Sequence, residues 1–115
     1  MTSQDDRRNR PRYPLRAFAE LGSSDKEWAA HVLDISYEGA RVVMLDEARL
    51  HAGETIRLRL EIPEAHRQTQ EQNFLHLSGT LVHQQAHTLG IQYQPATAQD
   101  AGLLRQLLDS LNITA

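Results

Sequence analysis

Strict alternation of apolar and polar side chains over residues 55–62 constrains the fold of this chain more than any other feature of its sequence. The apolar positions are all aliphatic: Ile56, Leu58, Leu60 and Ile62. The side chains between them are charged. Successive side chains of a β-strand point to opposite faces, so the pattern predicts a strand that buries one face. Pro63 ends this strand, because proline has no N–H to donate to a neighbour.

Five other short segments show β-like patterns, with turn-forming residues between them. They are residues 15–21, 28–34, 40–44, 74–83 and 89–93. Gly79 indicates a β-bulge or the close approach of another backbone. Residues 64–73 are polar and rich in glutamine, which predicts a long exposed loop. About six short strands with short links predict a small antiparallel β-barrel, because closure leaves no strand edge unpaired.

The last part of the chain changes to a helical period. Thr97 stands three residues before Asp100, which is the spacing of a capping box. Apolar side chains then recur at intervals of three and four: Ala101, Leu104, Leu107, Leu108 and Leu111. This pattern predicts one amphipathic helix over residues 97–112, lying on an open end or a face of the sheet. Residues 13–115 are therefore predicted to form a single, mainly β domain with a C-terminal α-helix.

The N-terminal segment differs from this body in charge. Residues 1–16 hold five arginines and two aspartates, a net charge of +3, whereas the rest of the chain holds seven basic and thirteen acidic residues, a net charge of −6. Residues 1–12 have no aliphatic or aromatic side chain after Met1, so they are predicted to form a flexible, arginine-rich arm. A basic arm on an acidic body suggests an anionic partner, and arginine grips phosphate through two parallel hydrogen bonds.

Composition excludes several classes of function. The chain has no cysteine, which rules out disulfides, a thiolate nucleophile and cysteine-ligated metal. No apolar run reaches the roughly 20 residues of a membrane span, and the polar N-terminus does not look like a signal peptide. A cytoplasmic protein without a membrane partner is therefore expected.

Catalysis has little support in the sequence. Ser36 lies near Asp34, but no histidine stands at a recognisable triad spacing from them. His83 and His87 straddle a predicted turn, and two ligands without a third make a weak zinc signal. We expect no enzyme, no metal site and no cofactor.

Two motifs stand out together. The first is Arg8-Asn9-Arg10-Pro11-Arg12, an RxxxR spacing preceded by Arg7, and the second is Asp34–Gly39, which reads DxSxxG. With these motifs in this order on this strand pattern, and with Gly90-Ile91-Gln92-Tyr93 before the terminal helix, the sequence resembles the PilZ family, the cyclic di-GMP receptor domains of bacteria. The resemblance covers essentially the whole chain. It implies a PilZ-like β-barrel, a receptor function and cyclic di-GMP as the ligand.

The resemblance also implies which residues form the site. Residues of both motifs would bind cyclic di-GMP: Arg7, Arg8, Arg12, Asp34, Ser36 and Gly39. Arg10 and His83 are further candidate contacts. Arg12 and Arg16 have the RxxxR spacing as well, but Arg16 falls on the polar face of the first strand, so Arg8 and Arg12 are the preferred pair.

The chemistry of these side chains suits such a ligand. Arginine can donate bidentately to guanine O6 and N7, stack on the purine or clamp a phosphate. The ionised Asp34 can accept from the N–H groups of guanine, and Ser36 offers a short hydroxyl. Gly39 permits a positive φ and lets the ligand approach the backbone. The alternatives are that Asp34 and Ser36 only form a turn, and that the arm is a solvated basic tail.

The sequence therefore predicts a receptor or adaptor that signals through ligand-induced ordering of its arm and then engages an effector protein that the sequence does not identify. One alternative is a PilZ-like scaffold in motility or pilus assembly that binds no nucleotide. Another is a small RNA-binding barrel, although the body is acidic and an aromatic content of 5% is low for a base-stacking surface. A DNA partner is not expected.

Overall fold

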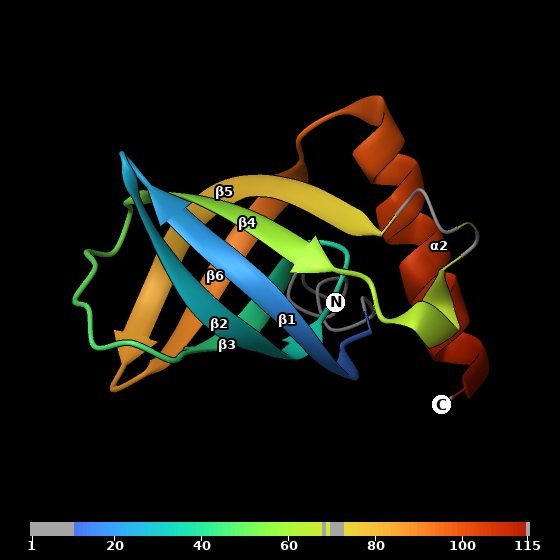
Figure 1. The fold of residues 1–115 in the computed structure, drawn as a ribbon, viewed down its shortest axis with the longest axis horizontal. Helices are drawn as coiled ribbons and strands as arrows, with labels where there is room; N and C mark the ends of the chain where they lie inside the picture. The colour runs from blue at the N-terminus through green and yellow to red at the C-terminus, as the bar shows by residue number, and fades with distance from the viewer. Residues whose placement is uncertain (1–10, 68, 70–72, 115) are drawn as a thin grey trace, which may run out of the picture.

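Six antiparallel strands form a closed barrel, and a C-terminal helix lies at one end of it (Figure 1). The computed structural model describes residues 11–67, 69 and 73–114. The strands are β1 (Tyr13–Ser23), β2 (Lys26–Ile35), β3 (Gly39–Met44), β4 (Thr55–Glu61), β5 (Phe74–Gln85) and β6 (Thr88–Pro95). A short 3-10 helix, η1 (Glu64–His66), follows β4, and the C-terminal helix is α2 (Ala98–Thr114).

The strands follow one another around the barrel in the order β1-β2-β3-β6-β5-β4, and the pairing of β1 with β4 closes it. The pairs β1–β2, β2–β3, β4–β5 and β5–β6 join neighbours in the sequence. The pairs β1–β4 and β3–β6 join segments that are distant in the sequence. The predicted antiparallel barrel with a C-terminal helix is confirmed.

Alternation decides which side chains fill the barrel. In β4 the aliphatic side chains Ile56, Leu58 and Leu60 are at most 2% exposed, whereas Arg57 and Arg59 face the solvent. Burial of each such aliphatic side chain stabilises the fold by roughly 1.5–3 kcal/mol, so the barrel interior is the main source of stability.

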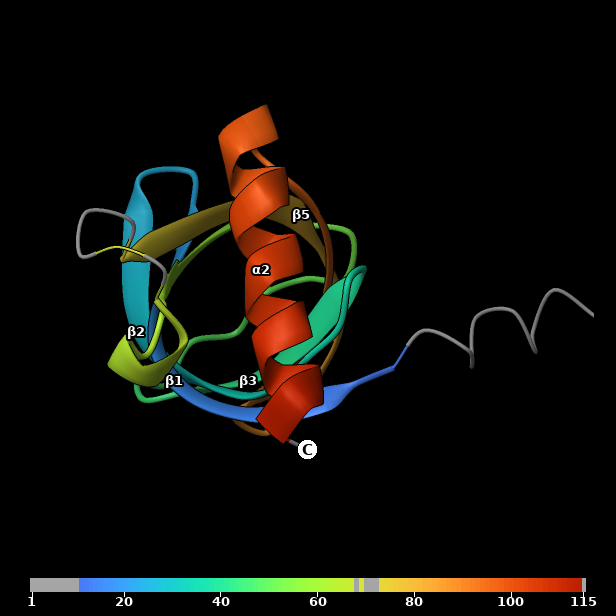
Figure 2. The ribbon, with the colours of Figure 1, turned by 90° about the vertical axis from the view of Figure 1, so that its right-hand side faces the viewer.

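Helix α2 covers one open end of the barrel (Figure 2). Its apolar face supplies Leu104, Leu107 and Leu111, which are buried in the same core. Thr97 caps the helix with one half of the predicted capping box, because the N–H of Asp100 donates to Thr97 Oγ1 at 3.1 Å. The Asp100 carboxylate accepts from the Thr97 hydroxyl at 2.7 Å, whereas a full capping box would have it accept from the Thr97 backbone N–H. Within the described part of the chain, no helix is long and apolar enough to cross a membrane.

The carbonyl oxygen of Gln92 lies 1.9 Å from the place where a Cβ on Gly79 would stand, so the predicted close backbone approach is confirmed. The bulge of β5 lies further along, between Leu81 and His83.

The prediction of a loop over residues 64–73 is wrong at its start, because the short helix η1 forms there. This helix contacts α2, since His66 Nδ1 lies 2.6 Å from the Ser110 hydroxyl.

Candidate functional site

A bulge in β2 sets the direction of Asp34. The register between β2 and β3 shifts between Val32 and Asp34, and both Val32 and Ile35 are buried in the core. The extra residue, Leu33, changes the phase of the alternation, so that Ile35 rather than Asp34 fills the interior. Asp34 is left on the outer wall of the barrel, near the end of its strand.

The Asp34 carboxylate holds two arginines. Arg12, just before β1, donates from Nη1 to Oδ1 at 2.6 Å, and Arg41 of β3 donates from Nε to Oδ2 at 2.6 Å. The Asp34 side chain is only 11% exposed, whereas the two arginine side chains are 52% and 53% exposed. The terminal nitrogens of Arg41 have no hydrogen-bond partner within the described residues. The pair therefore presents unused N–H donors to an anion from solvent.

A row of residues continues from Asp34 across the wall. Asp34 pairs with Arg41, Arg41 with Gly90 and Gly90 with His83, so the row crosses β2, β3, β6 and β5. The His83 ring lies over Gly90, and a Cβ on that glycine would stand 2.5 Å from His83 Nε2. The absence of a side chain at Gly90 thus makes room for the imidazole beside Arg41.

The DxSxxG loop is braced by Ser36. Its hydroxyl accepts from the N–H of Gly39 at 3.1 Å and of Glu38 at 3.3 Å, and it lies 3.1 Å from the Gly39 carbonyl, to which it donates. Ser36 is buried and serves the turn, whereas the Asp34 side chain bonds to arginines rather than to the loop. Gly39 does not adopt the positive φ that a glycine permits. A glycine is required there because a Cβ would lie 2.7 Å from the Ile91 carbonyl oxygen.

Tyr93 supports the loop from inside the barrel. Its hydroxyl lies 2.6 Å from the Ser36 carbonyl and 3.0 Å from the Gly39 carbonyl, and its N–H donates to the Glu38 carbonyl at 2.9 Å. Burial raises the pKa of the Tyr93 hydroxyl well above its usual range, against a smaller opposing effect of the Arg12 charge. The hydroxyl therefore remains a donor at any physiological pH.

These groups line one hollow of about 570 Å³ on the outer wall. Five candidate residues named from the sequence border it: Arg12, Asp34, Ser36, Gly39 and His83. Arg7, Arg8 and Arg10 lie outside the described residues. Arg16 is exposed on β1 and does not border the hollow.

Sequence reasoning missed two residues of this arrangement. The sequence signal for Arg41 is its place two positions after the DxSxxG motif, which puts it next to the loop. The signal for Tyr93 is its hydroxyl, which needs a polar partner when the ring is buried in the core.

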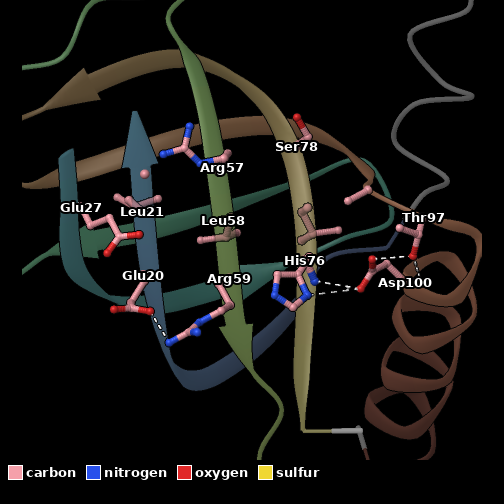
Figure 3. A pocket seen from close by; sticks show the side chains of 13 residues that line it. Glu20, Leu21, Glu27, Arg57, Leu58, Arg59, His76, Ser78, Thr97 and Asp100 are labelled. Atoms are coloured by element: carbon pink, nitrogen blue, oxygen red, sulfur yellow. Dashed lines mark hydrogen bonds and ion pairs between the residues drawn. The ribbon is translucent and has the colours of Figure 1, made fainter. Parts of the chain in front are cut away.

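A different hollow of about 550 Å³ lies on the wall of β1, β4 and β5 beside the start of α2 (Figure 3). Most of its charged side chains already have partners. Arg59 pairs with Glu20, and His76 Nδ1 lies 3.7 Å from Asp100 Oδ1. Arg57 donates to a backbone carbonyl of the β1–β2 turn. None of the motif residues that the structure describes borders it. It is a weaker candidate for an anion, because little positive charge is left unpaired. Among the residues that the structure describes, no three His, Asp or Glu side chains form a group that could hold a metal ion.

Comparison with known proteins places this arrangement in a family. The model of the PilZ domain matches residues 6–110. A search of curated proteins gives no match. Among solved structures, the PilZ domain of YcgR from Escherichia coli, with c-di-GMP, has a TM-score of 0.73 at 12% identity, covering 94% of this chain and 93% of that one. The PilZ domain of CeSA from a cellulose-synthesizing bacterium has a TM-score of 0.68 at 16% identity, covering 89% of this chain and 98% of that one.

A third neighbour is the Bacillus subtilis inhibitor of motility, MotI/DgrA, with a TM-score of 0.66 at 19% identity. The match covers 95% of this chain and 53% of that one, so the chain spans about half the length of this relative. At these identities the structural likeness concerns the fold, and the family assignment rests on the match over residues 6–110. With both motifs on a six-stranded barrel and the match extending over most of its length, the chain belongs to the PilZ domain family.

Proposed function

We propose that this protein is a receptor for cyclic di-GMP that passes the signal to an effector protein, and that its role is binding rather than catalysis. The observation that carries the proposal is the ion pair between Arg12 and Asp34, which joins the arginine motif to the DxSxxG loop at the edge of one hollow. Membership of the PilZ family and the c-di-GMP complex of the E. coli neighbour support the choice of ligand.

The charges of the hollow explain why arginines are needed from two sources. Among the described residues that border it, Arg12 and Arg41 balance Asp34 and Glu38, so their formal charges cancel. A cyclic dinucleotide carries two phosphates, and binding it requires additional positive charge. The predicted arm offers Arg7, Arg8 and Arg10, which precede Arg12 by two to five residues. Five extended residues reach about 17 Å, far enough to lay these guanidinium groups over a ligand in the hollow.

Asp34 has two roles in this proposal. It holds Arg12 and Arg41 side by side before the ligand arrives, so less side-chain entropy is lost on binding. A carboxylate has about four lone-pair sites, and those that the arginines leave free can accept from the N–H groups of guanine. Loss of Asp34 would therefore disorder the arginines as well as remove an acceptor.

The arm supplies the proposed signal. A basic segment without apolar side chains gains little by packing on the barrel, whereas a bound dianion gives it several charge-assisted contacts. Ordering of the arm on the ligand would create a new surface for the effector protein. Because one structural neighbour is named an inhibitor of motility, a motility protein is the first candidate for that partner.

Titration calorimetry with cyclic di-GMP tests the proposal. Arg12→Ala and Arg41→Ala are each expected to weaken binding by about 2–4 kcal/mol, the usual cost of removing one partner from a close charged contact. Arg16→Ala is the matched control, since it removes the same charge from an exposed strand position outside the hollow. Each variant should melt close to the wild type, because these side chains are about half exposed or more and add little to the core.

The proposal fails if the wild-type protein does not bind cyclic di-GMP, or if the Arg12 and Arg41 variants bind as tightly as the Arg16 variant. A parallel titration with single-stranded RNA addresses the remaining alternative. Tighter binding of RNA than of the cyclic dinucleotide would favour the hypothesis that the protein is a small RNA-binding barrel.

A further inference from the structure

A second hollow adjoins the first on the outer wall of the barrel. It measures about 650 Å³ and shares two lining residues with the first, Glu38 and Gln92. Strands β5 and β6 form its floor, Tyr37 of the DxSxxG loop stands at one side, and the start of α2 stands at the other. The two hollows meet at these shared residues, so together they reach from the arginines at Asp34 to the start of α2. The pair is called the depression below.

The two halves of this depression differ in chemistry. The first contains Arg12, Arg41 and Asp34. In the second, apart from Glu38 at the junction, no lining residue is charged. Its polar side chains are hydroxyls and carboxamides, with Thr80, Gln92 and Gln94 pointing outward from β5 and β6. Such a surface has little to offer a phosphate and much to offer an uncharged group rich in donors and acceptors.

These side chains keep their hydrogen-bonding capacity unused. Within the described residues, the side chains of Thr80, Gln92 and Gln94 make no hydrogen bond. By contrast, the carboxamide of Gln84 on the same strand pair binds three backbone groups, accepting from Leu50 N–H at 2.9 Å and donating to two carbonyls. Gln92 and Gln94 lie two positions apart on one face of β6, about 7 Å from each other, so their amides can act on one flat ligand.

We infer that this hollow, whose lining is uncharged apart from Glu38, is the subsite for one guanine base of the nucleotide, with the phosphates held at Arg12 and Arg41. The inference rests on the proposed function. A guanine edge presents the O6 and N7 acceptors and the N1 and N2 donors. A carboxamide can donate to the first pair or accept from the second. A volume of about 650 Å³ is ample for a purine with its ribose, since ligand pockets of roughly 300–1,000 Å³ hold drug-sized molecules.

The test is a double variant, Thr80→Val with Gln94→Leu, which removes hydrogen-bonding groups and no charge. Thr55→Val with Gln106→Leu is the matched control, because it makes the same exchanges at exposed positions outside both hollows. Calorimetry with cyclic di-GMP is expected to show a roughly 10- to 100-fold rise in Kd for the first variant and no change for the control. The slope of log Kd against log salt concentration should stay at the wild-type value, since no ion pair is lost, whereas Arg41→Ala should lower it.

Cyclic di-AMP serves as the second probe, because it keeps the phosphates and changes the base edges. Loss of the subsite should weaken binding of cyclic di-GMP more than binding of cyclic di-AMP. The Kd for cyclic di-AMP divided by the Kd for cyclic di-GMP should therefore fall toward one. An equal loss for both ligands overturns the assignment to guanine, because a carboxamide can also pair with adenine. Wild-type affinity of the double variant overturns the subsite but leaves the receptor proposal intact, whereas absence of wild-type binding overturns both. Gln94→Leu alone provides the same readout if the double variant melts early.

Discussion

Replacing Tyr93 by phenylalanine removes one hydroxyl from beneath the DxSxxG loop and leaves the ring that fills the core. The hydroxyl has one proton and two carbonyl neighbours, at Ser36 and Gly39. The Gly39 carbonyl keeps the N–H and the hydroxyl of Ser36 as donors, at 2.8 and 3.1 Å. The Ser36 carbonyl has no other hydrogen-bond donor among the described residues, so in the variant it is buried and unpaired.

An unpaired buried carbonyl costs about 1–3 kcal/mol, so Tyr93→Phe is expected to lower the free energy of unfolding by that amount. In a domain of this size the loss corresponds to a fall in melting temperature of roughly 4–12 °C. Chemical denaturation at pH 7 gives the free energy, and Tyr37→Phe is the control, because Tyr37 is exposed and its hydroxyl has no partner within the described residues.

The pH dependence gives a second, independent readout. The pKa of Tyr93 is raised in the folded protein, so its stabilising effect is fully present below the ordinary tyrosine pKa of about 10 and is lost as pH rises through the folded value. Wild-type stability should therefore decline above pH about 10, and part of that decline should be absent from Tyr93→Phe. A variant that unfolds at the wild-type denaturant concentration with an unchanged alkaline decline would refute the role assigned to this hydroxyl.

Three further predictions follow from local geometry and charge. Gly79→Ala should destabilise the barrel by several kcal/mol, because the new Cβ would stand 1.9 Å from a carbonyl oxygen of β6. Gly102→Ala should stabilise the protein by up to about 1 kcal/mol, because the position in α2 has open space around it; thermal melting compares the two variants. The hydrogen bond from the Ser23 hydroxyl, and to a smaller extent that from the His51 N–H, lowers the pKa of Glu54. This contribution to stability is therefore present above the ordinary pKa of 4.5 and is lost as pH falls. Ser23→Ala should flatten the acid side of a plot of melting temperature against pH, and an unaltered acid side would contradict this role. Amide signals of residues 1–12 should be sharp and poorly dispersed in the NMR spectrum of the free protein and become dispersed with cyclic di-GMP; signals that stay sharp at saturation would remove the arm from the mechanism.

Much of the fold could be read from local patterns. The alternation over residues 55–62 predicted β4, because a period of two admits one stable placement when one face must be buried. The cap at Thr97 predicted the start of α2, because side-chain oxygens there satisfy N–H groups that the helix leaves free. The loop after β4 was predicted less well: η1 packs on α2 through His66, and a polar sequence does not reveal such a contact.

The site was predicted as a set of residue types, but its geometry came from contacts between distant parts of the chain. Nothing local to Arg41 shows that it meets the Asp34 carboxylate, and nothing local to Tyr93 shows that its hydroxyl reaches the loop carbonyls 54 and 57 positions earlier. Sequence alone determined which strands exist, where the helix begins and which segments carry arginine and DxSxxG chemistry, since these depend on neighbouring residues. The tertiary structure decided the direction of the Asp34 side chain, because the bulge in β2 shifts the phase of the alternation. It also decided which residues stand beside Asp34, because barrel closure fixes the register between strands that are far apart in the chain.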